Sequence, residues 1–159
     1  MHTCTKRFDG FAAAHRQHRH DGHCALIHGH NWSFEFTFEA LELDENEFVL
    51  DFGKLKWLKA YLTEQFDHTL LLNEDDPQLV YLRSVLDNGP CAEGTVLAHI
   101  VVVPNCGAEG LAKYLHRAVD SRLANPVYCP EAEDYIVRQV RVLSVVVWED
   151  DKNSAAYTE

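Results

Sequence analysis

The amino-acid sequence predicts an α+β fold, in which helices cover one face of a mainly antiparallel sheet. Residues 32–39 alternate strictly between apolar and polar types, as a half-buried strand does. Two other segments, 52–65 and 111–122, carry apolar residues at helical spacing. The β-branched segments 95–103 and 136–148 indicate further strands. The resulting order of strand, strand, helix, helix, strand, helix and strand supports this fold class.

The first half of the chain contains a predicted strand pair and a helix. Residues 4–14 form an aromatic and alanine run that ends at His15, and we expect a strand there. A histidine-rich connection of about a dozen residues leads to the second strand. The apolar residues of that strand share one face, and they are Trp32, Phe34, Phe36 and Phe38. Asp51 is a good N-cap residue for an amphipathic helix over 52–65.

The second half of the chain alternates helices and strands. A shorter helix is predicted around 77–87. Strands are predicted at 95–103 and 136–148, and both segments are bounded by turn residues. The long helix with the apolar pattern 111–122 ends before Pro126, because the residue before a proline disfavours helical backbone angles. No repeat or linker divides the chain, so residues 1–159 are expected to form one domain.

Composition excludes several classes of function. The formal net charge of -11, with 14 scattered basic residues, argues against nucleic-acid binding but not against a small anionic ligand. No apolar stretch approaches the roughly 18 residues of a membrane span. The five cysteines form no short pair of the CxxC type, so a disulfide framework is not expected. We therefore expect a cytoplasmic protein.

A histidine cluster is the strongest chemical signal. Six of the ten histidines fall between positions 15 and 30. His28 and His30 share the parity of Trp32, Gly29 between them permits close approach, and a hairpin would bring His15 to the same place. Three imidazoles without a fourth protein ligand are typical of a catalytic zinc ion, Zn2+. The alternative is a set of solvated loop histidines, which is our interpretation of the remaining three: His18, His20 and His23.

Several motifs match one family in one order along the chain. They are Phe11-Ala-Ala-Ala-His15, Cys24-x-x-x-His28-Gly-His30-Asn-Trp, 49–55, Phe66-Asp67-His68 with its continuation to Asn73, 108–112 and Val147-Trp148-Glu149. The chain thereby closely resembles the 6-pyruvoyltetrahydropterin synthase and 6-carboxytetrahydropterin synthase family. The resemblance implies the tunnelling fold, a four-stranded antiparallel sheet with two long helices packed on one face. It also implies a homo-oligomer with active sites at subunit interfaces.

The resemblance further implies a reaction. Three residues separate Cys24 from His28, as in the bacterial 6-carboxytetrahydropterin synthase of queuosine biosynthesis. Such an enzyme converts 7,8-dihydroneopterin triphosphate to 6-carboxy-5,6,7,8-tetrahydropterin and releases acetaldehyde and triphosphate. A sibling enzyme making a 6-pyruvoyl or 6-hydroxymethyl product is the first alternative. A zinc or pterin-binding protein without catalysis, or a histidine-rich metal buffer, is the second.

The resemblance assigns roles to individual residues outside the metal site. Cys24 becomes the general base, because a nearby cation favours its thiolate, while Asp67 and His68 become its catalytic partners. Glu149 and Glu109 become acceptors for the N–H edge of the pterin. Each residue also has an alternative that does not depend on the motifs. Cys24 would be a buried thiol, and Asp67 and His68 would be a pair at a helix end. Glu149 would be an exposed acid at a strand end, and Glu109 an acid in the first turn of a helix. Three basic residues lie near enough in sequence to be candidates for the triphosphate: Arg16, Arg19 and Lys54.

Overall fold

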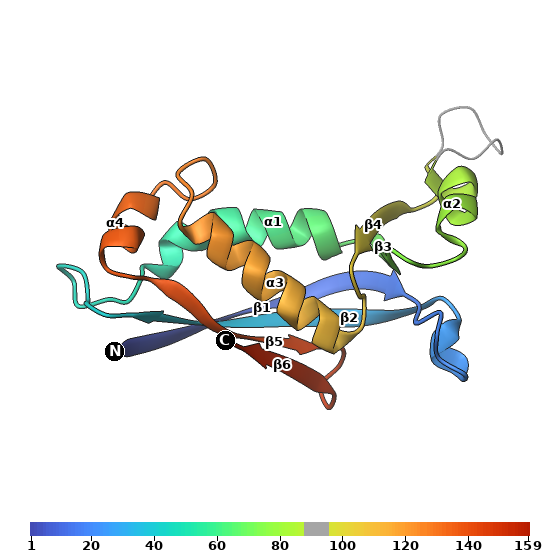
Figure 1. Cartoon of the computed structure of the whole chain (residues 1–159), viewed down its shortest axis with the longest axis horizontal. Helices are drawn as coiled ribbons and strands as arrows, with labels where there is room; N and C mark the ends of the chain where they lie inside the picture. The colour runs from blue at the N-terminus through green and yellow to red at the C-terminus, as the bar shows by residue number, and fades with distance from the viewer. Residues whose placement is uncertain (88–95) are drawn as a thin grey trace.

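One six-stranded sheet forms the base of the molecule, and helices lie above it (Figure 1). The computed structural model describes residues 1–87 and 96–159. The strands are β1 (His2–His15), β2 (His28–Ala40), β3 (Thr69–Asn73), β4 (His99–Val103), β5 (Arg141–Trp148) and β6 (Ser154–Thr158). The helices are α1 (Lys56–Phe66), α2 (Leu79–Leu82), α3 (Ala108–Leu123) and α4 (Ala132–Val137). Short turns of 3-10 helix, η1 (His23–Ala25) and η2 (Phe52–Leu55), precede β2 and α1, and a π-helical turn, η3 (Arg83–Asp87), follows α2.

The sheet has the strand order β4-β3-β1-β2-β5-β6. The neighbours β1, β2, β5 and β6 pair antiparallel, whereas β3 pairs parallel with both β1 and β4. The predicted four-stranded antiparallel sheet is therefore wrong in strand number and in direction, because the sheet has six strands and is mixed. Parallel neighbours need a crossover connection, and the α2 and η3 segment stands between β3 and β4.

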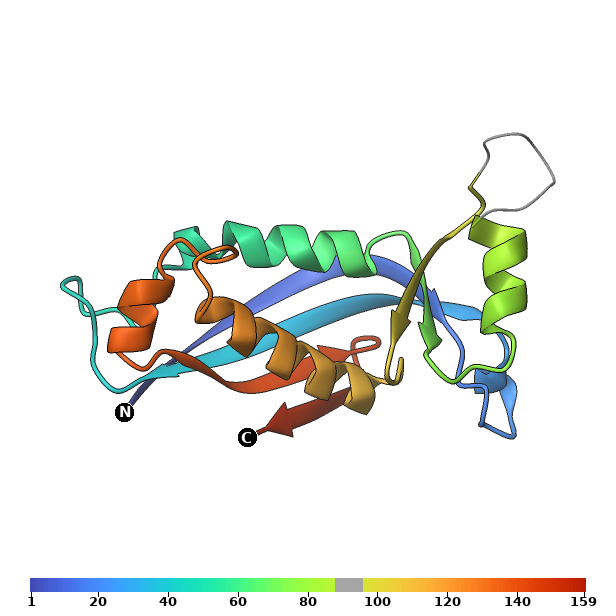
Figure 2. The ribbon, with the colours of Figure 1, turned by 45° about the horizontal axis from the view of Figure 1, so that its top comes forward.

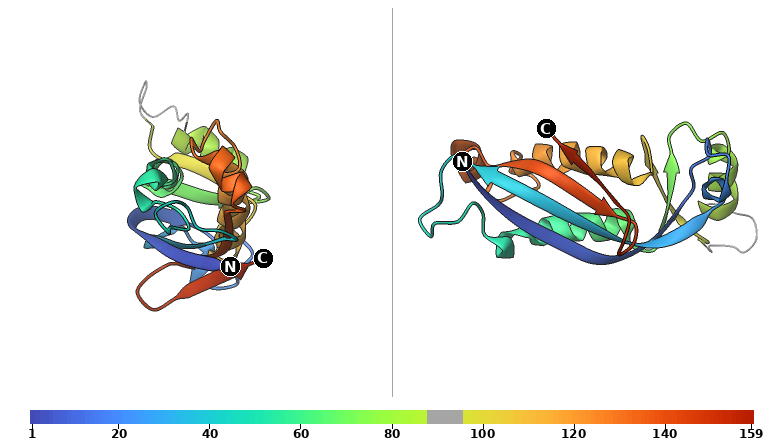
Figure 3. Two further views of the ribbon diagram at one scale, coloured as in Figure 1. Left: turned by 90° about the vertical axis from the view of Figure 1, so that its left-hand side faces the viewer. Right: turned by 90° about the horizontal axis from the view of Figure 1, so that it is seen from below.

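Aromatic residues of β2 form the centre of the core. Trp32, Phe34, Phe36 and Phe38 are fully buried on the face that the helices cover. Helix α1 packs on β1, and α3 packs on β5 and β6 (Figure 2). The other face of the sheet carries polar pairs such as Thr5 and Thr37, whose hydroxyl oxygens lie 3.1 Å apart. End-on and from below, the helices occupy one side of the long strands only (Figure 3). The predicted placement of two long helices on one face is confirmed.

Two expected strands begin later than predicted. The segment 136–148 starts in α4 and becomes strand β5 only at Arg141. Its first β-branched residues, Ile136 and Val137, are exposed on the helix rather than buried in the sheet. The segment 95–103 forms a strand only from His99. Its first residue belongs to 88–95, which lie outside the described residues. The helices at 52–65, 77–87 and 111–122 lie where they were predicted.

Strands β3 and β6 escaped prediction for different reasons. All five residues of β3 are buried, so its sequence shows no period-two alternation to separate it from a helix. β6 is an edge strand rich in alanine and polar residues, and it lacks the β-branched composition of a central strand. Both strands are defined by their neighbours rather than by their own pattern.

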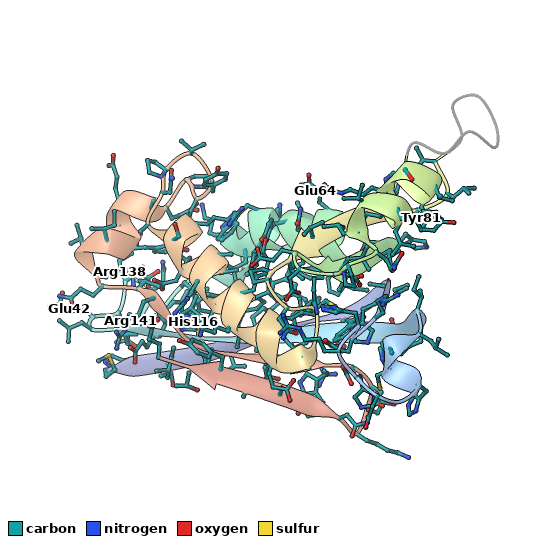
Figure 4. All side chains as sticks on the ribbon, turned by 45° about the vertical axis from the view of Figure 1, so that its right-hand side comes forward. Glu42, Glu64, Tyr81, His116, Arg138 and Arg141 are labelled. Atoms are coloured by element: carbon teal, nitrogen blue, oxygen red, sulfur yellow. The ribbon has the colours of Figure 1, made fainter. Side chains whose placement is uncertain are left out.

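Arg138 explains why the chain forms α4 instead of extending β5. Its side chain is buried and donates three hydrogen bonds to carboxylate oxygens of Asp134, one turn earlier in the helix. It also donates to the carbonyl oxygens of Glu42, Phe48 and Val49, at 3.3, 3.4 and 2.9 Å. This network ties the loop after β2 to α4 at the end of the molecule opposite Tyr81 (Figure 4).

Candidate metal site and its surroundings

Strand register brings three histidine rings together at one end of the β1–β2 pair. His15 lies directly opposite His28, and His30 lies two residues further along β2, opposite Ala13. Opposite residues and residues two apart project from the same face of a sheet. One ligand atom from each ring lies within 4.8 Å of the others, so the cluster could hold a metal ion. The site continues the buried aromatic face of β2 toward the end of the sheet.

The two nearest ring nitrogens present lone pairs to each other. Nδ1 of His15 lies 2.8 Å from the Cys106 carbonyl oxygen, and Nδ1 of His28 lies 2.8 Å from the Leu26 carbonyl oxygen. Because a carbonyl oxygen only accepts hydrogen bonds, each Nδ1 carries the ring proton. In two neutral imidazoles the Nε2 atoms, 3.1 Å apart, are then both acceptors and cannot hydrogen-bond each other. A cation between them removes this conflict, and two nitrogen ligands of a tetrahedral zinc ion are about 3.3 Å apart.

Trp32 forms the wall of the cluster on the core side. Its ring meets those of His15 and His30 edge to face, with centroids 5.0 and 5.2 Å apart. Its indole N–H donates to the Ala13 carbonyl oxygen at 3.1 Å, which fixes the ring. Burial lowers the pKa of His15 to about 4, so its imidazole is neutral at neutral pH. A neutral imidazole is the form that binds a metal ion.

Cys24 lies on the turn η1, four residues before His28. Its thiol is free and half-buried. The Cys24 carbonyl oxygen accepts a hydrogen bond from the Gln17 backbone N–H at 2.8 Å. This contact joins the two ends of the histidine-rich connection and holds the turn that carries the thiol near the start of β2.

Asp67 and His68 form a pair between α1 and β3. The Asp67 carboxylate lies 3.0 Å from Nδ1 of His68 and accepts a hydrogen bond from the Ala12 backbone N–H at 3.2 Å. His68 has a left-handed backbone, with φ of 57°, and its side chain is 83% exposed. Among the described residues, no hydrogen bond or ion pair joins this pair to Cys24. The imidazole thus faces outward from a single copy of the chain.

Glu149 and Glu109 occupy different surroundings. Glu149 follows β5 directly and is half-buried, and its backbone N–H donates to the Asn153 carbonyl oxygen at 3.1 Å. Strand register sets the preceding Trp148 opposite Ser33, so Glu149 lies at the end of β5 that is nearest the start of β2. Glu109 is exposed in the first turn of α3. It lines an open groove of about 720 Å³ whose other charged residues are Lys113 and Arg117.

The three basic candidates for a triphosphate each face a carboxylate. Arg16 lies 3.1 Å from Asp76, Arg19 pairs with Asp75, and Lys54 lies 3.3 Å from Glu131. His18 is also drawn into this acidic group, with its ring nitrogens 3.7 Å from Asp75 and 3.9 Å from Asp76. His20 and His23 are exposed. The contacts of Arg16, His18 and Arg19 anchor the histidine-rich connection to the segment after β3.

Sequence reasoning missed two residues that support the cluster, Asn73 and Cys106. Cys106 is fully buried and supplies the carbonyl that accepts from His15, and Asn73 accepts from the Cys106 backbone N–H at 2.7 Å. Cys106 is 91 positions from His15 and acts through its backbone, so no motif or spacing marks it. Only the strand pairing of β3 and β4 shows the connection.

The fold and the cluster define a class of protein: an α+β protein with a three-histidine site at the end of an antiparallel strand pair. The described residues include no helix long and apolar enough to cross a membrane. Comparison with known families then identifies the group. The family model of 6-pyruvoyl tetrahydropterin synthase matches residues 3–159, and the chain belongs to this family.

Curated relatives agree with this family. A 6-carboxy-5,6,7,8-tetrahydropterin synthase of Rickettsia bellii is 37% identical over 109 residues, covering 61% of this chain and 76% of that protein. A protein of the same name from Aquifex aeolicus is 31% identical over 137 residues, covering 86% of this chain and 76% of its own length. Another from Rickettsia conorii is 39% identical over 80 residues, 50% of this chain and 57% of that protein.

Solved structures agree with the fold. An uncharacterized protein from Wolinella succinogenes superimposes with a TM-score of 0.76 at 24% identity, over 99% of this chain and 98% of its own. The 6-pyruvoyl tetrahydropterin synthase of Plasmodium falciparum superimposes with a TM-score of 0.63 at 14% identity, with the same coverage of both chains. The expected tunnelling fold is therefore confirmed, although its sheet has more strands than predicted.

Proposed function

We propose that this domain, residues 1–159, is a zinc-dependent 6-carboxy-5,6,7,8-tetrahydropterin synthase. Its substrate would be 7,8-dihydroneopterin triphosphate, and acetaldehyde and triphosphate would be released. The observation that carries the proposal is the cluster of His15, His28 and His30, whose ligand atoms lie within 4.8 Å of one another. The family and the names of the curated relatives support the pterin chemistry. We place the reaction in queuosine biosynthesis in the cytoplasm.

The three histidines suit zinc because all donors are imidazole nitrogens and, among the described residues, no fourth protein ligand closes the site. Such an arrangement leaves one position of a tetrahedral ion for substrate. A bound zinc ion would stabilise negative charge that develops on side-chain oxygens of the substrate. The backbone carbonyls of Cys106 and Leu26 orient the imidazoles of His15 and His28 for this task.

Cys24 is the proposed general base. The reaction must remove protons from carbon atoms that bear hydroxyl groups, and a thiolate near the metal site is suited to accept them. The thiol is half-buried and free, on a turn that leads into the strand of His28 and His30. Its short connection to these ligands keeps the base and the metal site in one local unit.

Asp67 and His68 are the proposed proton-transfer partners of Cys24. The Asp67 carboxylate holds Nδ1 of His68 and leaves Nε2 free to exchange protons. Because the ring is exposed on a single copy, we propose that it meets Cys24 of a second copy in a homo-oligomer. The active site would then lie at a subunit interface, with residues from two chains.

Glu149 is the proposed anchor of the pterin ring. A carboxylate can accept two hydrogen bonds from the amino group and ring N–H of a pterin, which fixes the orientation of the substrate. Its half-buried position, at the end of β5 nearest the start of the strand that carries His28 and His30, supports this role. Glu109 is the second proposed acceptor. Its exposure among basic residues of α3 gives it a role only if a neighbouring copy covers that groove.

Product identification tests this proposal. Zinc-loaded protein is incubated with 7,8-dihydroneopterin triphosphate, and the pterin products are identified by mass spectrometry while acetaldehyde is quantified. The 6-carboxy product with an equimolar amount of acetaldehyde supports the proposal. A 6-pyruvoyl or 6-hydroxymethyl product would instead assign the chain to a sibling activity. Unchanged substrate would favour a zinc or pterin-binding protein without catalysis.

A further inference from the structure

A chain of two buried hydrogen bonds leads from the metal cluster to Asn73. Nδ1 of His15 donates to the carbonyl oxygen of Cys106 at 2.8 Å, and the backbone N–H of Cys106 donates to Oδ1 of Asn73 at 2.7 Å. All three residues are buried, with exposures of 2% for His15, 0% for Cys106 and 4% for Asn73. One residue, Cys106, therefore connects the histidine to the asparagine, through its carbonyl oxygen on one side and its backbone N–H on the other.

Strand pairing explains how Asn73 reaches the backbone of Cys106. Asn73 is the last residue of β3 and pairs with Val103, the last residue of β4. The chain after Val103 turns back toward β1, and Cys106 lies three residues further on. Its thiol also donates to the Arg16 carbonyl oxygen at 3.2 Å. The Cys106 segment is thus fixed from β3 and from the start of the histidine-rich connection.

The orientation of the Asn73 amide follows from its partners. A backbone N–H can only donate, so the amide oxygen must face Cys106. The amide nitrogen then faces Nδ1 of His18 at 3.3 Å and the side-chain oxygen of Gln17 at 3.5 Å. The amide thus presents its acceptor to Cys106 and its donor to His18 and Gln17, and an aspartate at this position would keep the acceptor alone.

We propose that Asn73 is a positioning residue for the metal site. By holding the backbone N–H of Cys106, it fixes the backbone of this residue and so directs the carbonyl that keeps the proton of His15 on Nδ1 and the lone pair on Nε2. Loss of the Asn73 acceptor frees the backbone dihedral angles of Cys106, its carbonyl then turns away from Nδ1, and His15 exchanges between tautomers. Partners that orient metal-binding histidines commonly change metal affinity by 10 to 100-fold. The proposal rests on the proposed metal site.

A purely structural role for Asn73 makes a different prediction. In that case, removing the side chain would lower the melting temperature and leave the affinity of the folded protein for metal unchanged. Asp120 provides a matched comparison, because its carboxylate accepts from the Val142 backbone N–H at 2.9 Å and it lies on α3, outside the metal cluster. Asn73 and Asp120 thus each accept one hydrogen bond from a backbone N–H, and each bond fixes a segment that is distant in the sequence.

The test measures zinc dissociation constants by competition with a chromophoric chelator for wild type, Asn73→Leu, Asn73→Asp and Asp120→Leu. We expect Asn73→Leu to bind zinc roughly tenfold more weakly, at the lower end for such partners because Asn73 acts through one intervening residue. Asn73→Asp keeps the acceptor and restores tight binding, and Asp120→Leu loses stability alone. Equal affinities of Asn73→Leu and Asp120→Leu overturn the proposal. Asn73→Ala replaces Asn73→Leu if the latter does not fold.

A second measurement tests the role of Asn73 independently of whether the protein binds zinc. Long-range nitrogen–proton NMR correlations report the tautomer of His15 in metal-free protein. We expect the Nδ1–H form in wild type and in Asn73→Asp, and a mixture of tautomers in Asn73→Leu. An unchanged tautomer in Asn73→Leu overturns the role of Asn73. Failure of wild type to bind zinc, with the tautomer change present, would instead contradict the proposed function alone.

Discussion

The Nε2 atoms of His15 and His28 lie 3.1 Å apart, and neither carries a proton to share with the other. Both rings place their proton on Nδ1, which donates to a backbone carbonyl oxygen at 2.8 Å. Two lone pairs at this distance repel each other in the metal-free protein, and they attract a cation placed between them. We therefore expect the contact between these two rings to destabilise the metal-free protein and to stabilise the protein when a metal ion is bound.

His28→Ala should therefore have opposite effects with and without metal. In metal-free protein, the variant removes the lone-pair repulsion and a half-exposed ring, so its melting temperature equals or exceeds that of wild type. Zinc at 100 times its dissociation constant stabilises wild type by about 2.7 kcal/mol and the variant far less. Differential scanning calorimetry with and without zinc measures both effects. A large loss of stability in metal-free His28→Ala would contradict the lone-pair arrangement.

Cys24→Ala should retain zinc and lose turnover. Removal of a general base commonly lowers the rate 100 to 10,000-fold, and the three histidines remain in place. The matched control is Cys4→Ala, which changes another half-buried free thiol, on β1 well before His15. Zinc content by atomic absorption and turnover by product analysis distinguish the two variants. Comparable activity of Cys24→Ala and Cys4→Ala would remove Cys24 from the mechanism.

Mixing inactive variants tests the proposed interface. Cys24→Ala and His68→Ala each lack one part of the site, and each is expected to be inactive alone. If the base and the imidazole come from different copies, mixed oligomers contain some sites in which both are intact. Co-refolding or subunit exchange should then restore part of the wild-type turnover. No recovery in mixed oligomers, verified by native mass spectrometry, would indicate that each site uses one chain only.

Arg138→Ala should destabilise the fold without affecting the metal site. The variant leaves carbonyl oxygens of Glu42 and Val49 without their buried donor and removes the contacts to Asp134. We expect a loss of about 2–3 kcal/mol, because unpaired buried polar groups carry most of the effect. Arg138→Lys should recover only part of it, since an ammonium cannot form the two-pronged contact. Urea unfolding measures the loss, and an unchanged zinc dissociation constant provides the control.

The sequence predicted those parts of the molecule that have a local pattern. The alternation of 32–39 defined the buried face of β2, and the same parity placed His28 and His30 on that face. Helices α1 and α3 followed from apolar spacing. The position of His15 in the cluster could be predicted because it required only a hairpin between neighbouring strands. The register of such a hairpin is strongly specified where one face of the strands is buried.

Features that depend on contacts between distant parts of the chain could not be predicted from the sequence. The strand β3 is buried on both faces and has no alternation, and the start of α4 depends on the contacts of Arg138 with a loop about 90 residues earlier. The supporting role of Asn73 passes through the backbone of Cys106, which any residue type could supply. Backbone-mediated contacts leave no mark on residue type, so only the paired strands showed them.

Metal removal and replacement during turnover tests the central claim most directly. Purified protein is stripped with a chelator, assayed with 7,8-dihydroneopterin triphosphate, and assayed again after one equivalent of zinc is added, with His28→Ala in parallel. We predict no 6-carboxy-5,6,7,8-tetrahydropterin from stripped protein, full recovery with zinc in wild type, and no recovery in His28→Ala. Unchanged turnover of the stripped protein, or equal recovery in His28→Ala, would contradict a catalytic metal site at the three histidines.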